Sequence, residues 1–284
     1  MGLATIDIMT GGFEEPITRA RIGDDLRRLG LGSGDVVLVH ASLRSLGWVC
    51  GGPVAVVQGL LDVLGPDGTL VVPAYSGENS DPKHWQNPPV PESWWPVIRE
   101  HMPVFDPAVT RSHSVGVVPE TVRTWPGAVR SDHPHTSFAA VGAAAAELMA
   151  DHKIECQLGE ASPLAALERA DAKVLLLGTG FDTCTTFHLA EYRVPGLPMF
   201  EFGTAIATPT GRQWVSYTDV RINSDDFEAL GQAYQEAATV RAGLVGEADC
   251  TLFPVRGAVE FAVGWLRDNR TTSAAEGGPV PLGG

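Results

Sequence analysis

The chain has 284 residues, 44% of them hydrophobic, so it is long enough to bury a large core within one domain. Its 20 Lys and Arg residues stand against 34 Asp and Glu residues, and a formal net charge of −14 argues against nucleic acid as the main partner. There is no apolar run of the ~18 residues that a membrane helix needs, no signal peptide pattern and no paired cysteine motif, so we expect a cytoplasmic protein with reduced thiols and no membrane partner.

The first quarter of the chain predicts a helix followed by a strand, helix and strand. Apolar residues at helical spacing indicate an amphipathic helix over residues 17–29, which a glycine-rich stop ends. The β-branched run at residues 36–39 predicts a short strand buried on both faces. An apolar helix over residues 54–65 and a second strand at residues 70–75 follow. This order is typical of a βαβ unit in a mainly parallel sheet.

The rest of the chain predicts an irregular segment and then a second α/β portion. Residues 75–110 are rich in Pro and Trp without periodicity, as in a binding loop or lid. We then expect a strand at residues 137–142, helices around Glu147 and from Ser162, and a strand at residues 173–180. Alternating residues 200–220, with a turn at 209–211, predict a hairpin. The final predicted elements are a helix over residues 225–241, a strand at 250–255 and a helix at 257–268.

These elements together predict an α/β fold: a three-layer α/β/α sandwich with a mainly parallel or mixed central sheet and a small antiparallel β-hairpin insertion. Residues 1–270 are expected to form a single domain that contains the insertion at residues 196–245, and residues 271–284 to form a disordered tail. The chain is expected to be a monomer or a homodimer.

In such sheets, ligands bind at the carboxyl ends of the strands, and the residues there are polar. The loop after the first strand carries two serines and an arginine, whose hydroxyl, N–H and guanidinium groups suit phosphates. A capping loop with a solvent-facing arginine explains the same residues, and both interpretations stay open. The glycine motifs at residues 27–32 and 178–180 do not stand at the positions, relative to the predicted strands and helices, at which the common acetyltransferase and nucleotide-binding sites carry such motifs. His133 and His135 lack nearby carboxylates at metal-ligand spacing, so no metal is expected.

His188 and Glu191 lie three residues apart on a predicted helix that follows the predicted buried strand at residues 173–180. A carboxylate at this spacing can accept a hydrogen bond from one ring nitrogen and leave the other nitrogen basic. The alternatives are a metal-ligand pair and two polar residues on an ordinary helix. The threonines at the start of this helix (Thr183, Thr185 and Thr186) lie where a ligand would bind, which favours a catalytic base with its orienting partner.

Several long motifs in order, spread over nearly the whole chain, resemble those of the aminoglycoside 3-N-acetyltransferase family, which is unrelated in fold to the GNAT acetyltransferases. They are GDVVLVHASLRSLG, GPDGTLVVPAYS, FDPAVTRSHSVGVVPE, AVRSDHPHTSFAAVG, LGEASPLAALERADAKVLLLGTGFDTCTTFHLAE and VGEADCTLF. The resemblance implies an α/β/α fold, acetyl-CoA as co-substrate, and acetylation of an aminoglycoside amine, most often the 3-amino group of the deoxystreptamine ring, with antibiotic resistance as the consequence.

The resemblance also implies roles for individual residues. His188 would be the general base and Glu191 its partner, in a direct transfer. The residues implied in CoA binding are His40, Ala41, Ser42, Leu43, Arg44, Ser45, Ser114, Val115, Gly116, Val117, Arg130 and Ser131. The chain departs from some members after the second strand, where Tyr75, Ser76, Gly77 and Glu78 replace a Trp-Asp pair.

The chemistry agrees with these roles, because an ammonium must lose a proton before it attacks a thioester, and a histidine with an ordinary pKa near 6.5 is a suitable acceptor. A polycationic substrate calls for an acidic site, for which the candidates are Glu78, Asp81, Asp182 and Asp219. Tyr75 is a further candidate for substrate binding, and Thr186 is a candidate oxyanion donor. Three alternatives stay open: another amine as acceptor, including a biosynthetic one; a non-catalytic binder of polycations; and a methyltransferase.

Overall fold

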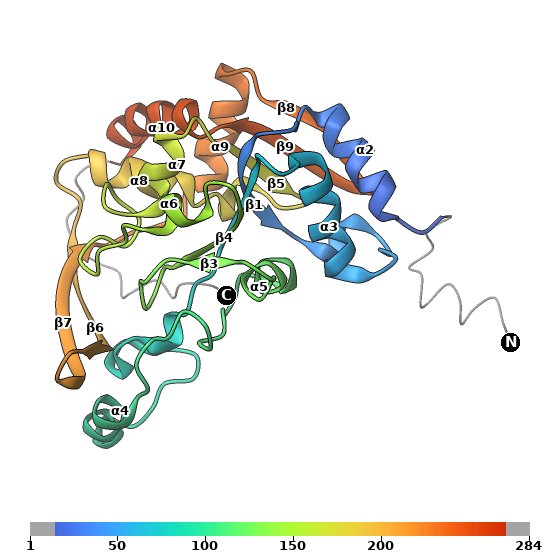
Figure 1. The fold of residues 1–284 in the computed structure, drawn as a ribbon. Helices are drawn as coiled ribbons and strands as arrows, with labels where there is room; N and C mark the ends of the chain where they lie inside the picture. Colours follow the sequence, from blue (N-terminus) through green and yellow to red (C-terminus); the bar gives the residue numbers. More distant parts are fainter. Residues whose placement is uncertain (1–14, 271–284) are drawn as a thin grey trace, which may run out of the picture.

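The computed structural model describes residues 15–270, so the predicted tail at 271–284 lies outside the described residues (Figure 1). The helices are α2 (Arg19–Leu29), α3 (Gly52–Leu64), α4 (Trp95–His101), α5 (Val117–Arg123), α6 (Ala145–Met149), α7 (Pro163–Arg169), α8 (Thr186–Arg193), α9 (Phe227–Ala237) and α10 (Val255–Asn269). The strands are β1 (Val36–Ala41), β2 (Thr69–Pro73), β3 (Val129–Arg130), β4 (Phe138–Gly142), β5 (Lys173–Leu177), β6 (Met199–Thr208), β7 (Gly211–Val220), β8 (Arg241–Val245) and β9 (Ala248–Pro254). Short 3₁₀ turns span Leu43–Leu46, Gly77–Asn79, Pro82–His84, Glu92–Trp94 and Phe181–Thr183.

The central sheet has the strand order β3-β4-β2-β1-β5-β9-β8. Its middle strands β2, β1 and β5 are parallel, whereas β4 and β9 pair antiparallel to β2 and β5. The sheet is therefore mixed, and the predicted α/β fold is confirmed. The strands β6 and β7 form a separate two-stranded antiparallel sheet.

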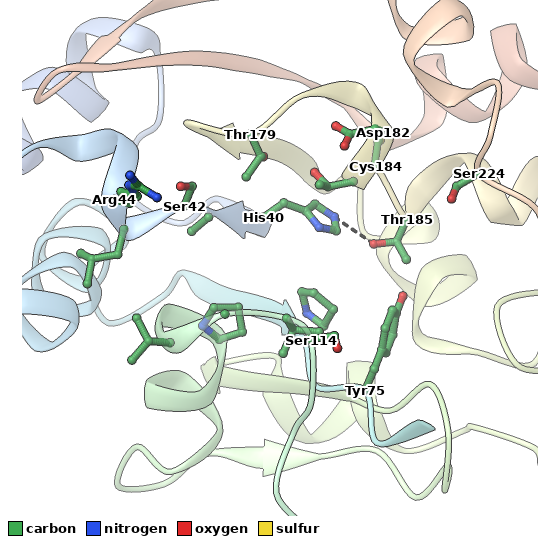
Figure 2. Close-up of a pocket in the computed structure, with 18 of the residues that line it drawn as sticks. His40, Ser42, Arg44, Tyr75, Ser114, Thr179, Asp182, Cys184, Thr185 and Ser224 are labelled. Atoms are coloured by element: carbon green, nitrogen blue, oxygen red, sulfur yellow. Dashed lines mark hydrogen bonds between the residues drawn. The ribbon is translucent and has the colours of Figure 1, made fainter. Parts of the chain in front are cut away.

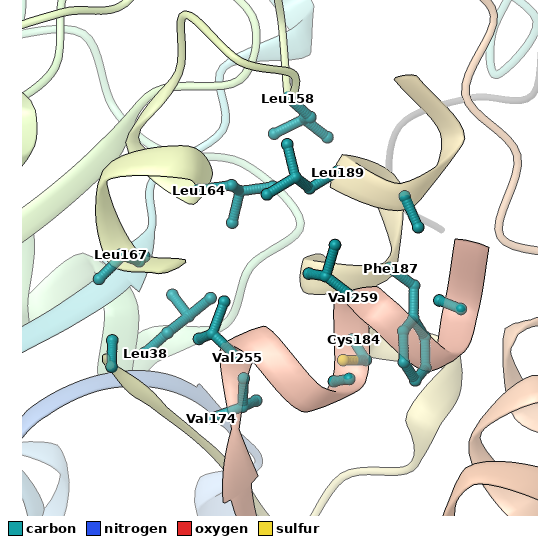
Figure 3. Close-up of a cluster of buried hydrophobic side chains, with 14 of the residues drawn as sticks. Leu38, Leu158, Leu164, Leu167, Val174, Cys184, Phe187, Leu189, Val255 and Val259 are labelled. Carbon is teal, nitrogen blue, oxygen red and sulfur yellow. The ribbon is translucent and has the colours of Figure 1, made fainter. Parts of the chain in front are cut away.

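Helices cover both faces of the sheet, which gives the three layers (Figure 1). Because side chains alternate along a strand, Val37 and Val39 of β1 pack against α2, α3 and α5, while Leu38 packs on the opposite face against α6 to α10. Figure 3 shows this second core, where Leu38 and Val174 from the strands meet Val255 of α10. The apolar runs of β1 and β5 are buried on both faces, as their lack of polar alternation predicts.

The predicted hairpin is present, and its turn lies between Thr208 and Gly211. Beyond it, the predicted helix over residues 225–241 was wrong at its end, since α9 stops at Ala237 and β8 begins at Arg241. The β-branched Thr239 and Val240 precede an edge strand that pairs with β9, and this pairing prevails over helical continuation. The hairpin sheet thus covers only Met199 to Val220 of the predicted insertion, and β8 belongs to the central sheet.

The proline-rich segment is less irregular than its sequence suggests, because it contains the helix α4. Pro96 occupies the first turn of this helix, where its missing N–H is not needed. Arg212 of the hairpin donates to the carbonyl oxygens of Met102, at 2.7 Å, and Arg99, so the segment and the hairpin are held together. Within residues 15–270, no helix is both long and apolar enough to cross a membrane.

Candidate active site

A pocket of about 1250 Å³ opens at the carboxyl ends of the parallel strands β1, β2 and β5 (Figure 2). Its wall combines the loop after β1, the start of the loop after β2, the segment leading into α5, the loop after β5 and the first half of α8. This is the edge of the sheet at which the sequence predicts ligand binding.

Gly178 starts the turn that carries the chain from β5 to α8. Its φ of +70° lies in the left-handed region, and an added Cβ would come within 2.6 Å of the Cβ of Ser45. The Ser45 hydroxyl also donates to the Gly178 carbonyl at 3.0 Å. The glycine therefore lets the loops after β1 and β5 meet beside the pocket.

His188 and Glu191 on α8 are in direct contact. The Nδ1 of His188 lies 2.5 Å from Oε2 of Glu191, which is completely buried, while His188 keeps 9% of its surface exposed and lines the pocket. Because the carboxylate accepts the Nδ1 proton, Nε2 is the ring nitrogen with an available lone pair. The geometry is that of a base with an orienting carboxylate.

The second oxygen of Glu191 is held from outside α8. Its Oε1 accepts from the backbone N–H of Asn223 at 2.9 Å and from the guanidinium of Arg270. A buried carboxylate needs such donors to stay ionised. Both oxygens are thus committed, and the carboxylate cannot rotate freely.

His40, at the end of β1, lies across the pocket from α8 and is hydrogen-bonded through Nε2 to the Thr185 hydroxyl at 2.9 Å (Figure 2). Burial, together with the nearby His188, lowers the pKa of His40 to about 3, so this ring is neutral at physiological pH. Burial raises the pKa of the neighbouring Tyr75, which keeps its hydroxyl protonated. The floor of the pocket therefore offers neutral hydrogen-bonding groups beside His188.

Most of the loop predicted to hold CoA phosphates lies on the pocket. His40, Ala41, Ser42, Leu43 and Arg44 line it, whereas Ser45 bonds to Ser42 and Gly178 behind the wall. The exposed Arg44 guanidinium makes no ion pair or hydrogen bond with residues 15–270 and is available to an anionic ligand.

The residues Ser114, Val115, Gly116 and Val117 also line the pocket, and Ser114 has a φ of +59°, which is unusual for a residue other than glycine. Arg130 and Ser131 do not line it. The Arg130 guanidinium donates to backbone carbonyls, including that of Ala74 at 2.6 Å, and its burial lowers its pKa to about 10. The fully buried Ser131 hydroxyl lies 2.9 Å from His152 Nδ1. Both side chains are built into the scaffold.

The five residues predicted to bind the substrate are divided between the pocket and other places. Tyr75 and Asp182 line the pocket, and Asp182 is the only carboxylate that does so among the described residues. Glu78 lies on the surface, with an oxygen 3.6 Å from Nε2 of His113. Asp81 is buried against Arg99 at 2.8 Å, and Asp219 accepts from the Gln157 N–H at 2.7 Å and the Tyr192 hydroxyl at 2.8 Å. The last two have structural partners that occupy their carboxylates.

His133 and His135 belong to a buried group with His152, which we call the histidine cluster (His133, His135 and His152). The rings of His133 and His152 stack with centroids 4.6 Å apart, and the Tyr217 hydroxyl of β7 lies 2.8 Å from His135 Nδ1. Burial lowers the pKa of all three, to about 4 for His135 and His152. Within residues 15–270, no three His, Cys, Asp or Glu side chains are grouped in a way that could hold a metal ion. The cluster anchors the hairpin to the core.

The sequence reasoning missed part of the wall: Gly47, Trp48, Val49, Gly52, Pro73, Pro119, Ile222 and Ser224. Trp48 lines the pocket and is 47% exposed. Its position four residues after Arg44, on a loop predicted to bind a ligand, could have identified it. Ile222 and Ser224 follow the hairpin and had no such signal. Thr186, predicted as an oxyanion donor, is fully buried on α8, whereas its neighbour Thr185 lines the pocket.

Comparison with known proteins gives consistent matches. A sequence model of the family described as aminoglycoside 3-N-acetyltransferase matches residues 38–267. The SPbeta prophage-derived aminoglycoside N(3')-acetyltransferase-like protein YokD of Bacillus subtilis is 44% identical over 255 residues, 89% of this chain and 94% of that protein. Aminoglycoside N(3)-acetyltransferase VII of Streptomyces paromomycinus is 37% identical over 93% of this chain and 96% of that protein.

Solved structures agree in fold. The crystal structure of YokD superimposes with a TM-score of 0.91 at 42% identity, covering 92% of this chain and 97% of that one. The structure titled AAC-IIIb binary with CoASH has a TM-score of 0.81 at 34% identity, covering 92% and 100% of the two chains. That titled AAC-VIa bound to sisomicin has a TM-score of 0.80 at 30% identity, covering 89% and 98%.

Proposed function

This chain belongs to the aminoglycoside 3-N-acetyltransferase family of acyltransferases, and on that premise we propose that it transfers the acetyl group of acetyl-CoA to an amino group of an aminoglycoside. The 3-amino group of the deoxystreptamine ring is the acceptor we assign, after the family description, with resistance as the consequence in the cytoplasm. The observation that carries the proposal is the contact of 2.5 Å between His188 and the buried Glu191 at the pocket wall.

His188 acts as the general base in a direct transfer. An aminoglycoside amine is largely an ammonium at neutral pH, so it first loses one proton to solvent. Nε2 of His188 then accepts a second proton, from the neutral amine, as the nitrogen attacks the thioester carbonyl carbon. The new C–N bond forms, the carbonyl oxygen carries the charge of the tetrahedral intermediate, and the C–S bond then breaks. The CoA thiolate takes up a proton from the histidinium. The Thr185 hydroxyl, which is hydrogen-bonded to His40 and lines the pocket three residues before the base, suits the developing oxyanion.

The pocket suits CoA as donor. Ser42 and Arg44 present a hydroxyl and an uncommitted cation for phosphate groups, and Trp48, Val49 and Val117 provide an apolar wall for the pantetheine arm. The structure of AAC-IIIb with CoASH, from a chain of the same fold, supports this choice. Arg130 and Ser131, which the resemblance implied in this path, contribute through the scaffold only.

Asp182 is the carboxylate placed to receive a charged amine of the acceptor, and the structure of AAC-VIa with sisomicin supports an aminoglycoside in this role. A covalent route through Cys184 is disfavoured. The thiol is fully buried, and burial raises its pKa to about 12, so the nucleophilic thiolate is scarce.

The test follows free thiol released from acetyl-CoA by purified protein with a panel of aminoglycosides and simple amines. The panel includes simple amines because YokD is named only as acetyltransferase-like. Aminoglycoside-dependent release should fall by roughly 10²- to 10⁴-fold in His188→Ala. His101→Ala, at an exposed histidine on α4, is the matched control and should keep full activity.

Two outcomes contradict the proposal. Acetyl-CoA binding without release for any amine would move the substrate outside this class. Tight aminoglycoside binding without turnover, unchanged in His188→Ala, would identify a non-catalytic binder instead.

A further inference from the structure

Arg270 reaches the site from the far end of the chain. It follows α10 and lies beyond residue 267, where the family match ends, yet its Nη1 donates to Oε1 of Glu191. We propose that Arg270 is a positioning residue of the acetyl transfer, which fixes Glu191 as the ionised partner of His188 and so sets the pH above which His188 is a free base. This inference rests on the proposed role of the His188–Glu191 pair.

The guanidinium is held in one orientation by contacts on three sides. Its Nε and Nη2 donate to the two oxygens of Asp226 at 2.7 and 2.6 Å, and Nη2 also donates to the carbonyl of Asn223 at 2.6 Å. The group packs over the Phe227 ring, which also contacts the His188 ring, 4.7 Å away between centroids. Only 15% of the Arg270 side chain is exposed. A bidentate contact of this kind with a carboxylate fixes the orientation of the guanidinium as well as attracting it.

Two cations can compensate the charge of the buried Glu191: the Arg270 guanidinium and the protonated ring of His188, which becomes the remaining one when Arg270 is removed. A carboxylate without solvent access is more stable as the neutral acid unless a charge or several N–H groups compensate, and a neutral acid is a weak acceptor for His188. Burial by itself would lower the pKa of Arg270, but the hydrogen bonds of Asp226 and the charge of Glu191 raise it overall, so the guanidinium stays charged at every pH of interest.

Counting charges around His188 gives the direction of the effect. Glu191 on its own helix and His40 from β1 lie next to it, and Asp182 lines the same pocket. Arg270 after α10 binds the far oxygen of Glu191, and Asp226 at the start of α9 binds Arg270. His40 is neutral. Removing the cation leaves the buried carboxylate uncompensated, and the histidine then retains its proton to a higher pH. Removing Asp226 has the opposite sign.

The test measures protonation of His188 directly, by NMR titration of the protein with ¹³C-labelled histidine, assigned with His188→Ala. In Arg270→Met the titration midpoint should move to higher pH by roughly one unit. In Asp226→Asn it should move to lower pH, and in Arg270→Lys, which keeps the charge, it should stay close to the wild-type value. The acid limb of kcat/KM against pH should move with each midpoint.

Arg256→Met is the matched control, since it removes the same charge from the same helix. Arg256 pairs with Asp171 near the start of α10, roughly 21 Å along the helix from Arg270. This variant should leave the midpoint unchanged. If Arg270→Met does not fold by circular dichroism, Asp226→Asn and Arg270→Lys decide the question.

An unchanged midpoint in folded Arg270→Met, or a shift of the same sign in Asp226→Asn, would overturn the inference. Because the titration needs no turnover, a protein that transfers acetyl to no amine would refute the proposed function while leaving the role of Arg270 measurable.

Discussion

Replacing Glu191 with Gln tests whether the carboxylate, rather than its shape, serves the base. The site requires two acceptors, because Oε2 faces the Nδ1–H of His188 and Oε1 faces the N–H of Asn223 and the guanidinium of Arg270. An amide has one acceptor oxygen. The stronger donors on the Arg270 side should take it, and the NH₂ group then faces His188, which stabilises the tautomer with its proton on Nε2. That tautomer cannot accept a proton from the amine.

The expected loss in kcat for Glu191→Gln is roughly 10²- to 10⁴-fold, the range for loss of a general base, which corresponds to about 3 to 5 kcal/mol of activation free energy. Loss of the charge-assisted contact between Glu191 and Arg270, which keeps Asp226 as its carboxylate partner, should also lower the free energy of unfolding by about 1 to 3 kcal/mol. Both are measured on the same sample, by thiol release at saturating substrates and by urea unfolding.

Glu168→Gln is the control for the stability term alone. Glu168 accepts from both terminal nitrogens of Arg193, at 2.8 and 2.6 Å, away from the pocket. This variant should lose stability but keep kcat. A folded Glu191→Gln enzyme that turns over within tenfold of the wild type, or loses activity only through KM, would refute the reasoning.

Three further outcomes are expected. Cys184→Ala should keep kcat within about threefold, because direct transfer uses no thiolate, and an acetylated protein detected by mass spectrometry after mixing with acetyl-CoA would argue otherwise. Gly178→Ala should lower the free energy of unfolding by about 1 to 2 kcal/mol, because Gly178 has a positive φ and the Cβ of Ser45 lies close to it. Gly264→Ala, in open space on α10, should raise the free energy of unfolding by about 0.5 to 1 kcal/mol. Equal urea midpoints for the two variants would contradict this expectation. The histidine cluster is neutral in the fold because burial lowers its pKa values, while an unfolded chain binds those protons near pH 6.5, so stability is complete above that pH and is lost as the pH falls towards 4. The urea midpoint should therefore be lower at about pH 5 than at about pH 7.5, and equal midpoints would show that the cluster is not protonated on unfolding.

The central part of the fold was predictable because β1 and β5 are short apolar runs, a pattern that requires burial on both faces. Parallel strands bring their carboxyl ends to one edge, so residues far apart in sequence, such as His40 and Asp182, were expected at one site, and both line the pocket. The predicted family resemblance is also confirmed.

What could not be predicted depends on partners supplied by distant segments. Nothing near Arg130 shows that carbonyls of other loops would take up its guanidinium, and nothing near Asp219 shows that Tyr192 and the Gln157 N–H would occupy its carboxylate. Arg270 is the reverse case, because it was not predicted at the site and yet it contacts Glu191. Its own surroundings in the sequence resemble any helix end, and only the packing of α10 against α8 brings it to Glu191.

The end of α10 also determines how far the protein can be shortened. A chain cut after residue 267 would retain the whole family-matched span and the apolar contacts of α10, including those of Val255, Val259 and Leu266 with the core. Such a chain should fold. It would lack the cation beside Glu191, so even a folded trimmed protein should be a slow enzyme. For protein engineering, the C-terminal boundary must include Arg270, and family similarity alone would place it too early.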